Sequence, residues 1–376
     1  MRRVWVVPVL LLAVASFAQD VPIPAPPQIG GNSYILLDFS SGEILADSQS
    51  DELIEPASLT KLMTAYTAFH ALREEQVSLQ DEVLVSEKAW RTEGSRMFIE
   101  VNTRVSLEDL LRGMIIQSGN DASVALAEHV AGTEEVFVGL MNQHAELLGM
   151  SNSTFMNTTG LPADGHYMTA RDIARLAYAI ISEFPEYYGW YSEREFTYND
   201  IRQHNRNALL WRDESVDGLK TGYTDAAGYC LVTSADRSGM RLISVVTGMA
   251  SAQAREDGSQ ALLNYGFRFY ETHKLYTSGE EVTTARVWGG NPQYVSLGLA
   301  DDFHITVPRG RYDALEAMMD LETDLSAPLG EGVQVGEVRV TLREEEVAAM
   351  PLMTLSAIGE ASLWTRIKDE VTLWLQ

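Results

Sequence analysis

The chain has 376 residues, 45% of them hydrophobic, and a formal net charge of −25 at pH 7. This length exceeds the size at which a single hydrophobic core usually keeps growing, so two domains are expected. The acidic balance argues against nucleic acid as a partner, because phosphate binding needs a basic face, and it is also compatible with solubility alone.

The N-terminus has the pattern of a secretory signal peptide. Arg2 and Arg3 precede an apolar run from Val4 to Phe17, and small residues stand at Ser16 and Ala18. We expect residues 1–18 to be a cleaved signal, since the run is short for a membrane span and Pro8 interrupts it. The proline-rich residues 19–29 are predicted to form an extended linker.

Cys230 is the only cysteine, so no intramolecular disulfide can form even in an oxidising compartment. It lies in an apolar, strand-like run. We therefore predict a packed, inert thiol rather than a nucleophile.

Hydrophobic periodicity predicts an α/β (α+β) domain over residues 30–268, with a sheet covered by helices. Alternating segments at 33–38 and 43–46 indicate a hairpin at a sheet edge. A helix is predicted to begin near Pro56, and further helices at 107–116, 121–131, 134–148, 170–181 and 252–265. Strands are predicted at 228–234 and 242–247.

The pattern of hydrophobic and polar residues changes after about residue 270. Short alternating segments such as 333–342 predict a small all-β domain over residues 269–358. The last segment, 359–376, is predicted to form an amphipathic helix with Leu363, Ile367, Val371 and Trp374 on one stripe.

Ser58 and Lys61 are the first motif with chemical meaning. Residues i and i+3 share a helix face, so the two side chains can lie within hydrogen-bond reach near a helix N-terminus. A serine hydroxyl needs a neutral acceptor for its proton, and Lys61 could serve if burial and a second ammonium, that of Lys220, lower its pKa. The alternative is an ordinary exposed helical pair.

Ser118 and Asn120 form a second motif, in a turn between two apolar helical stretches. Ser118 could relay a proton between Lys61 and a leaving group, while Asn120 could hydrogen-bond a substrate amide. The alternative is a helix cap.

Lys220, Thr221 and Gly222 form the third motif, just before a predicted strand. Gly222 would allow a substrate chain to approach the backbone, and Lys220 with Thr221 would hold a substrate carboxylate. The alternative is a hairpin with a surface lysine.

With these motifs the chain resembles the low-molecular-mass penicillin-binding proteins (class C, type 5), specifically the D-alanyl-D-alanine carboxypeptidases of serine peptidase family S11. The resemblance covers essentially the whole mature chain, and it rests on the three motifs together with residues 55–63, 117–122, 168–172, 205–211, 217–225 and 266–272.

The resemblance implies a β-lactamase/transpeptidase-like fold and a serine acyl-enzyme that removes the terminal D-alanine of peptidoglycan pentapeptides, with a role in cell-wall biosynthesis and cell shape. It implies Ser58 as nucleophile, Lys61 as base, the backbone amides of Ser58 and Tyr223 as the oxyanion hole, and Thr221 with Arg255 as holders of the substrate carboxylate. It also implies covalent inhibition by β-lactams, and no cofactor or metal.

Other functions are compatible with part of this pattern. A β-lactamase or a DD-endopeptidase could use the same motifs, but residues 151–160 lack the deacylating glutamate of class A lactamases. A catalytically silent wall-binding scaffold would not need the intact motif set. His166 is expected to be a wall or cap residue, because Lys61 and Ser118 already supply both proton transfers.

The resemblance further implies a peripheral location on the periplasmic face of the inner membrane, held by the C-terminal helix. Trp364 and Trp374 suit a membrane interface. The helix is acidic, however, so apolar insertion would have to carry the binding. The alternative is a helix docked on the β-domain.

Overall fold

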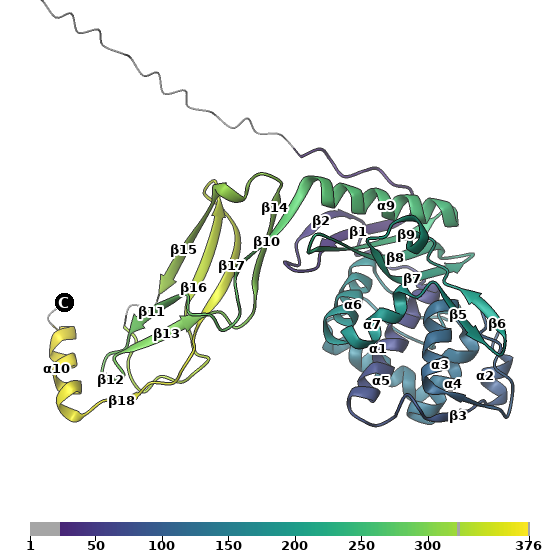
Figure 1. The fold of residues 1–376 in the computed structure, drawn as a ribbon, viewed down its shortest axis with the longest axis horizontal. Helices are drawn as coiled ribbons and strands as arrows, with labels where there is room; N and C mark the ends of the chain where they lie inside the picture. Colours follow the sequence, from purple (N-terminus) through teal and green to yellow (C-terminus); the bar gives the residue numbers. More distant parts are fainter. Residues whose placement is uncertain (1–22, 322–323, 375–376) are drawn as a thin grey trace, which may run out of the picture.

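The computed structural model describes residues 23–321 and 324–374, which form a helix-covered sheet followed by a separate β-rich module (Figure 1). The predicted signal peptide, residues 1–18, lies outside the described residues. Residues 23–29 of the predicted linker have no regular secondary structure.

The first part is organised around a five-stranded antiparallel sheet. Its strands, in spatial order, are β2 (Ile44–Ser48), β1 (Ser33–Asp38), β9 (Met240–Met249), β8 (Gly228–Arg237) and β7 (Val216–Thr224). The predicted N-terminal hairpin is confirmed, with β2 at one edge of the sheet. The opposite edge is β7, which carries the Lys220-Thr221-Gly222 motif.

Helices cover both faces of this sheet, as predicted (Figure 1). One face packs on a large cluster that contains α1 (Thr60–Arg73), α3 (Leu107–Arg112), α4 (Asn120–Ala131), α5 (Glu134–Leu147) and α6 (Ala170–Glu183). The other face packs on α9 (Ala252–Phe269). Alternation along β1 explains this arrangement, because Ile35 joins the large cluster and Leu36 joins the α9 cluster.

Short elements complete this part. They are α2 (Glu87–Arg91), α7 (Pro185–Tyr188), α8 (Leu209–Arg212), the 3₁₀ turns η1 (Ala57–Leu59) and η3 (Gly189–Ser192), the π-helical turn η2 (Gly113–Gln117), and the hairpins β3 (Glu82–Leu84) with β4 (Arg104–Ser106) and β5 (Glu195–Tyr198) with β6 (Ile201–His204).

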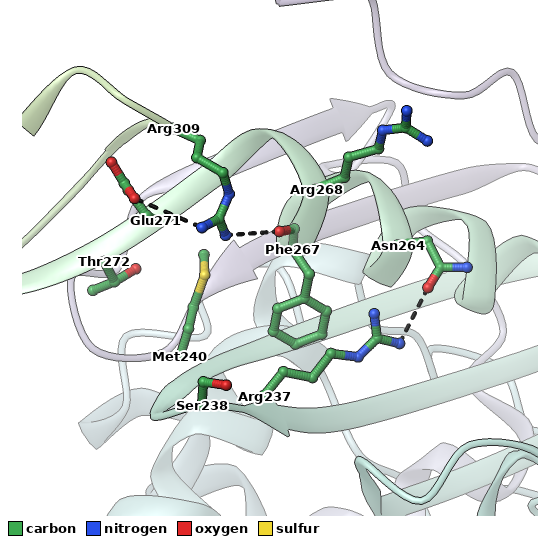
Figure 2. Close-up of a pocket in the computed structure, with 9 residues that line it drawn as sticks. All are labelled: Arg237, Ser238, Met240, Asn264, Phe267, Arg268, Glu271, Thr272 and Arg309. Carbon is green, nitrogen blue, oxygen red and sulfur yellow. Dashed lines mark hydrogen bonds and ion pairs between the residues drawn. The ribbon is translucent and has the colours of Figure 1, made fainter.

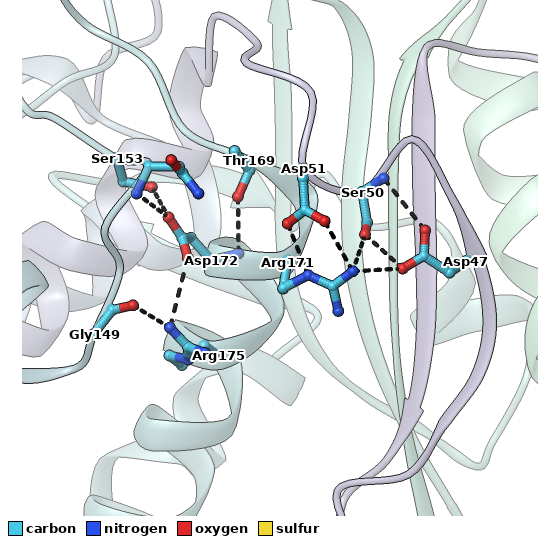
Figure 3. Close-up of polar contacts among 10 residues, drawn as sticks. Asp47, Ser50, Asp51, Gly149, Ser153, Thr169, Arg171, Asp172 and Arg175 are labelled. Atoms are coloured by element: carbon cyan, nitrogen blue, oxygen red, sulfur yellow. Dashed lines mark hydrogen bonds and ion pairs between the residues drawn. The ribbon is translucent and has the colours of Figure 1, made fainter.

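The segment that leads into the nucleophile motif is tied to the start of α6. Ile54 forms a β-bridge with Met168. Figure 3 shows Arg171, at the start of α6, reaching Asp47, Ser50 and Asp51 together, with its Nε 2.8 Å from Asp51 Oδ1 and its Nη2 2.8 Å from Asp47 Oδ2. These contacts fix the chain a few residues before Ser58.

The second part is all-β, as predicted. β10 (Tyr270–Tyr276) pairs with β14 (Phe303–Pro308), and β12 (Gly290–Asn291) pairs with β18 (Gly359–Glu360). A five-stranded sheet has the order β11 (Thr283–Arg286), β13 (Tyr294–Gly298), β17 (Glu345–Thr354), β16 (Gln334–Leu342) and β15 (Leu315–Leu321), with the 3₁₀ turn η4 (Tyr312–Ala314) before β15. It has its own apolar core.

The two parts meet at a partly buried polar network. Asp38, at the end of β1, accepts hydrogen bonds from Ser41 Oγ at 2.9 Å and from Thr272 Oγ1 at 2.7 Å. Thr306 on β14 contacts both hydroxyls, at 2.6 and 2.8 Å. Because Asp38 is fully buried, this network fixes the turn after β1 against β10 and β14.

A pocket of about 630 Å³ lies beside this junction (Figure 2). Two of its three arginines make structural contacts: Arg309 donates to the carbonyl of Phe267 at 2.9 Å, and Arg237 donates to Asn264 Oδ1 at 3.1 Å and pairs with Asp213 at 2.6 Å. None of the three sequence motifs lines it.

The described chain ends in α10 (Leu363–Trp374), which confirms the predicted C-terminal helix. Within residues 23–321 and 324–374, no helix has both the length and the apolar character needed to cross a bilayer.

Candidate active site

Ser58 and Lys61 lie where a 3₁₀ turn passes into α1. Pro56 stands at the N-cap of η1, which confirms that a helical segment begins there. Lys61 Nζ donates to Ser58 Oγ at 3.0 Å and to the carbonyl of Thr159 at 2.6 Å. The predicted i, i+3 contact is therefore present, and the alternative of an exposed pair is wrong because Lys61 is only 1% exposed.

Burial changes the proton affinity of Lys61. Desolvation and the nearby Arg206 guanidinium lower its pKa to about 7, against the opposing effect of Asp121. Lys220 is also buried, and desolvation, Lys61, Arg206 and Arg255 hold its pKa well below the usual range. The predicted effect of burial on the Lys61 pKa is confirmed, but the cation that lowers this pKa further is Arg206 rather than Lys220.

Ser118 and Asn120 occupy the bend between η2 and α4. Ser118 adopts a left-handed conformation, with φ 68°, and its buried Oγ has no hydrogen-bond partner among the described residues. Asn120 Nδ2 donates to the carbonyl of Glu93 at 2.6 Å, while its Oδ1 has no partner within the same residues. The helix-cap alternative is not observed, since the N-cap of α4 is Gly119 without a side-chain bond.

Asp121 fixes the loop at residues 93–99 against this bend. Its carboxylate accepts the backbone N–H groups of Met97 and Phe98, each at 2.9 Å. The backbone N–H of Asn120 donates to the carbonyl of Ser95 at 2.7 Å. These bonds hold Ser95 at the rim of the cavity that Ser58 and Ser118 line.

The Lys220-Thr221-Gly222 motif lies within β7, at the free edge of the sheet. A Cβ built on Gly222 would approach the carbonyl of Pro56 to 3.2 Å and the Cβ of Ala57 to 3.3 Å. A side chain at this position would therefore have to push the nucleophile turn away by a few tenths of an ångström. Lys220 is 3% exposed, which excludes the surface-lysine alternative.

Arg255 extends from α9 toward the same edge. Its guanidinium makes long hydrogen bonds to the carbonyls of Gly222 at 3.4 Å and Arg206 at 3.5 Å, and it lies over the Tyr229 ring, 5.6 Å from the centroid. Tyr229 in turn lies 4.3 Å, centroid to centroid, from Tyr223. Arg255 is 7% exposed, so it is not the surface arginine that the sequence also allowed.

Six of the predicted site residues line one cavity of about 210 Å³, whereas Lys61, Asn120 and Lys220 are not among its lining residues. It is lined by Ser58, Ser95, Ser118, Arg206, Thr221, Gly222, Tyr223, Tyr229 and Arg255. Sequence reasoning did not single out Ser95, Arg206 or Tyr229. Residues 205–211 carried the resemblance, but no local pattern could show that Arg206 lies near Lys61.

Two other residues lie as expected. His166 bonds Thr60 Oγ1 through Nε2 at 2.9 Å, and burial lowers its pKa to about 4, which fits a wall residue. Cys230 is fully buried, and burial raises the pKa of its thiol to about 11.

Comparison with known proteins places this site in a family. The family model described as D-alanyl-D-alanine carboxypeptidase, peptidase S11, matches residues 20–251. The chain belongs to this family. A second model, the C-terminal domain of penicillin-binding protein 5, matches residues 270–360. The resemblance inferred from the motifs is thereby confirmed.

Full-length relatives agree with this assignment. The chain is 43% identical to the D-alanyl-D-alanine carboxypeptidase DacC of Escherichia coli K12, over 96% of this chain and 92% of that protein. It is 42% identical to DacA of the same strain, over 93% of this chain and 89% of that protein. The chain is a D-alanyl-D-alanine carboxypeptidase, and this function is supported over the β-lactamase alternative.

Solved structures confirm the predicted fold. Penicillin-binding protein 5 from Haemophilus influenzae superposes with a TM-score of 0.87 at 42% identity, covering 90% of this chain and all of that one. Penicillin-binding protein D2 of Listeria monocytogenes, solved with ampicillin bound, has a TM-score of 0.60 at 31% identity and covers 65% of this chain and all of that one.

Proposed function

We propose that Ser58 is the nucleophile and Lys61 the base of this carboxypeptidase. The 3.0 Å contact between Lys61 Nζ and Ser58 Oγ carries the proposal, because a buried lysine with a pKa of about 7 is half neutral at pH 7. Neutral Lys61 takes the hydroxyl proton as Ser58 Oγ attacks the carbonyl carbon between two D-alanines.

The tetrahedral intermediate collapses when the leaving amine of the terminal D-alanine is protonated. Ser118 relays the proton from Lys61 to this nitrogen, for which its unpartnered buried hydroxyl is suited. Backbone amides of Ser58 and Tyr223 stabilise the oxyanion, where one such donor is typically worth about 3–4 kcal/mol. Water then hydrolyses the acyl-enzyme.

The substrate is a peptidoglycan stem pentapeptide lying along the free edge of β7. Thr221 and Arg255 hold its terminal carboxylate, and Lys220 adds positive charge. Asn120 hydrogen-bonds the peptide through its free Oδ1, while Gly222 gives room for the backbone to approach. The buried cations are the main support, since a carboxylate is attracted to them in a low-dielectric site.

β-Lactam antibiotics acylate the same serine, which agrees with the ampicillin-bound relative. We expect a slowly hydrolysed adduct, because residues 151–160 place a backbone carbonyl, that of Thr159, beside Lys61 rather than a deacylating glutamate. Rapid penicillin turnover with no stable adduct on Ser58 would contradict this.

The test is product analysis with a synthetic pentapeptide. Mass spectrometry should detect one released D-alanine and, in parallel, a penicillin-labelled peptide that contains Ser58. Ser58→Ala should abolish both. Release of D-alanine by this variant would mean that the nucleophile is wrong.

We also propose that residues 359–376 hold the enzyme on the periplasmic face of the inner membrane, after cleavage of residues 1–18. In support, Leu363, Trp364, Ile367 and Val371 are all exposed, Leu363 by 71% and Trp364 by 83%. Trp374, the other predicted interface residue, lies outside the residues whose side chains are described.

The polar side of α10 docks on the β-domain. Asp369 is buried and accepts hydrogen bonds from the Gly289 N–H at 2.9 Å and from Arg286 Nη2 at 3.1 Å. The docked helix therefore keeps its apolar stripe outward. A protein ending at Ala361 should lose vesicle binding but keep its activity on soluble peptide; if it still pellets with membranes, the anchor proposal is wrong.

We further propose that the chain divides into the catalytic domain, residues 30–268, and the β-domain, residues 269–358. The division is supported by the separate apolar cores of the two parts.

A further inference from the structure

We propose that Asn157 is a positioning residue for the base Lys61 and acts through the turn formed by residues 157–161. The inference rests on the role proposed above for Lys61. Asn157 is not among the residues that line the cavity, so it would act by fixing the atom that orients the amine.

The side chain of Asn157 organises the whole turn. Its Oδ1 accepts the backbone N–H groups of Thr159 at 3.1 Å and Gly160 at 2.7 Å, and the Thr159 hydroxyl at 3.1 Å. Its Nδ2 donates to the carbonyl of Leu161 at 2.9 Å. One amide thus makes four hydrogen bonds within five residues and fixes the direction of the peptide groups between them.

The carbonyl that this turn presents is the second partner of Lys61. Thr159 O lies 2.6 Å from Nζ, closer than Ser58 Oγ at 3.0 Å. A neutral amine has two N–H groups and one lone pair. When one N–H donates to Thr159, the lone pair can point at the Ser58 hydroxyl, which is the geometry a general base needs.

The turn also has anchors that do not depend on Asn157. Glu134 Oε1 accepts the Thr158 hydroxyl at 2.8 Å and the Thr158 N–H at 3.1 Å, and Thr64 Oγ1 donates to the Thr158 carbonyl at 2.8 Å. Loss of the Asn157 side chain should therefore disturb the Thr159 carbonyl without unfolding the domain.

Asn142 offers a matched control. Its side chain also fixes this region, with Oδ1 accepting the Phe155 N–H at 2.9 Å and Nδ2 donating to the Phe155 carbonyl at 2.9 Å. These bonds end two residues before Asn157 and do not reach the carbonyl that Lys61 contacts. Asn142→Ala should lower stability while the pH dependence of acylation stays unchanged.

The experiment measures the second-order rate of Ser58 acylation by a fluorescent penicillin between pH 5 and 9 for the full chain. Asn157→Ala should lower the plateau rate about 10- to 100-fold, as expected for a misplaced reacting group. The acid limb of its profile, the pH range in which the acylation rate falls as Lys61 becomes protonated, should move to lower pH. An ammonium that loses a hydrogen-bond acceptor has a lower pKa.

Asn157→Asp keeps the acceptor oxygen and adds a negative charge. Its plateau should stay within about threefold of the wild-type rate, and its acid limb should move to higher pH, since a nearby carboxylate favours the ammonium. Opposite limb shifts in the two variants, with none in Asn142→Ala, are the expected result.

The inference is overturned if the Asn157→Ala limb does not move, or if Asn142→Ala moves it equally. Either result would leave Asn157 with a purely structural role. If wild-type Ser58 itself is not labelled, the proposed function fails first, so the two failures can be told apart.

Discussion

Gly160→Ala tests how closely the turn at residues 157–161 must approach the nucleophile. Gly160 has φ +82°, and a Cβ built on it would lie 1.7 Å from the carbonyl oxygen of Ala57. Real Cβ atoms essentially never come within 3.0 Å of a neighbour, so one of the two backbones must move by at least 1.3 Å, the difference between 3.0 and 1.7.

Either movement displaces a group that contacts or carries the catalytic side chains. A shift of the turn withdraws the Thr159 carbonyl from Lys61, and a shift of Ala57 displaces the adjacent Ser58. A misplacement of about 1 Å can cost roughly 100-fold in rate, so acylation by penicillin should fall by about two orders of magnitude.

Gly165→Ala is the matched control. Gly165 has the same φ of +82°, but its nearest neighbour to a built Cβ is Met156 Sδ at 3.9 Å. It should suffer only the strain of a left-handed alanine, about 1–2 kcal/mol of unfolding free energy, with an unchanged acylation rate. Thermal melts of both variants measure the strain of a left-handed alanine, and their acylation rates measure the additional effect of the clash in Gly160→Ala. Near wild-type acylation in Gly160→Ala would refute the reasoning.

Three further predictions follow from the charges of the site. Because Lys61 has a pKa of about 7, the acylation rate should rise with pH through neutrality and fall about tenfold per pH unit below pH 6. A flat rate between pH 5 and 9 would exclude Lys61 as the base. Arg255→Gln should raise KM for a D-Ala-D-Ala peptide about 10- to 100-fold and leave the KM for a carboxamide analogue unchanged. An equal rise in KM for both substrates would mean that Arg255 does not bind the carboxylate. His166, with its pKa lowered to about 4, binds fewer protons folded than unfolded, so stability should be lost as the pH falls from 6.5 to 4. His166→Gln should show a smaller drop in Tm between pH 7 and 4.5 than the wild-type protein. An equal drop would mean that groups other than His166 cause the acid sensitivity.

The sequence predicted the elements well where one periodicity lasted for several turns. The helix expected at residues 170–181 is observed as α6, and the alternation at residues 333–342 as β16. The prediction was incomplete at residues 107–116, where α3 stops at Arg112 and a π-turn follows. Apolar spacing cannot distinguish these backbone forms, since tertiary packing selects between them.

This difference matters because the π-turn ends at Ser118. Ser118 follows the π-turn in a left-handed conformation and lines the cavity. The sequence could name Ser118 from its motif, but the bend that aims it arises from the packing of η2.

The same limit applies to the contacts of Lys61. Its neighbour Ser58 is three residues away, so helical geometry alone predicts their contact. Thr159 and Arg206 come from loops that lack periodic patterns, and they reach Lys61 only after the whole domain has folded. Local sequence patterns therefore predict the Ser58–Lys61 pair but not the groups that orient Lys61 and lower its pKa.

Charge shows the difference between global and local properties most clearly. The chain carries a net charge of −25, which by itself gives no reason to expect an anionic substrate. Yet Lys61, Arg206 and Arg255 all help to lower the pKa of the buried Lys220, and Arg206 also lowers the pKa of Lys61. A carboxylate bound among them would relieve this repulsion and raise the pKa of Lys61. Substrate binding should therefore move the acid limb of kcat above that of kcat/KM, because the first reports the bound enzyme and the second the free enzyme.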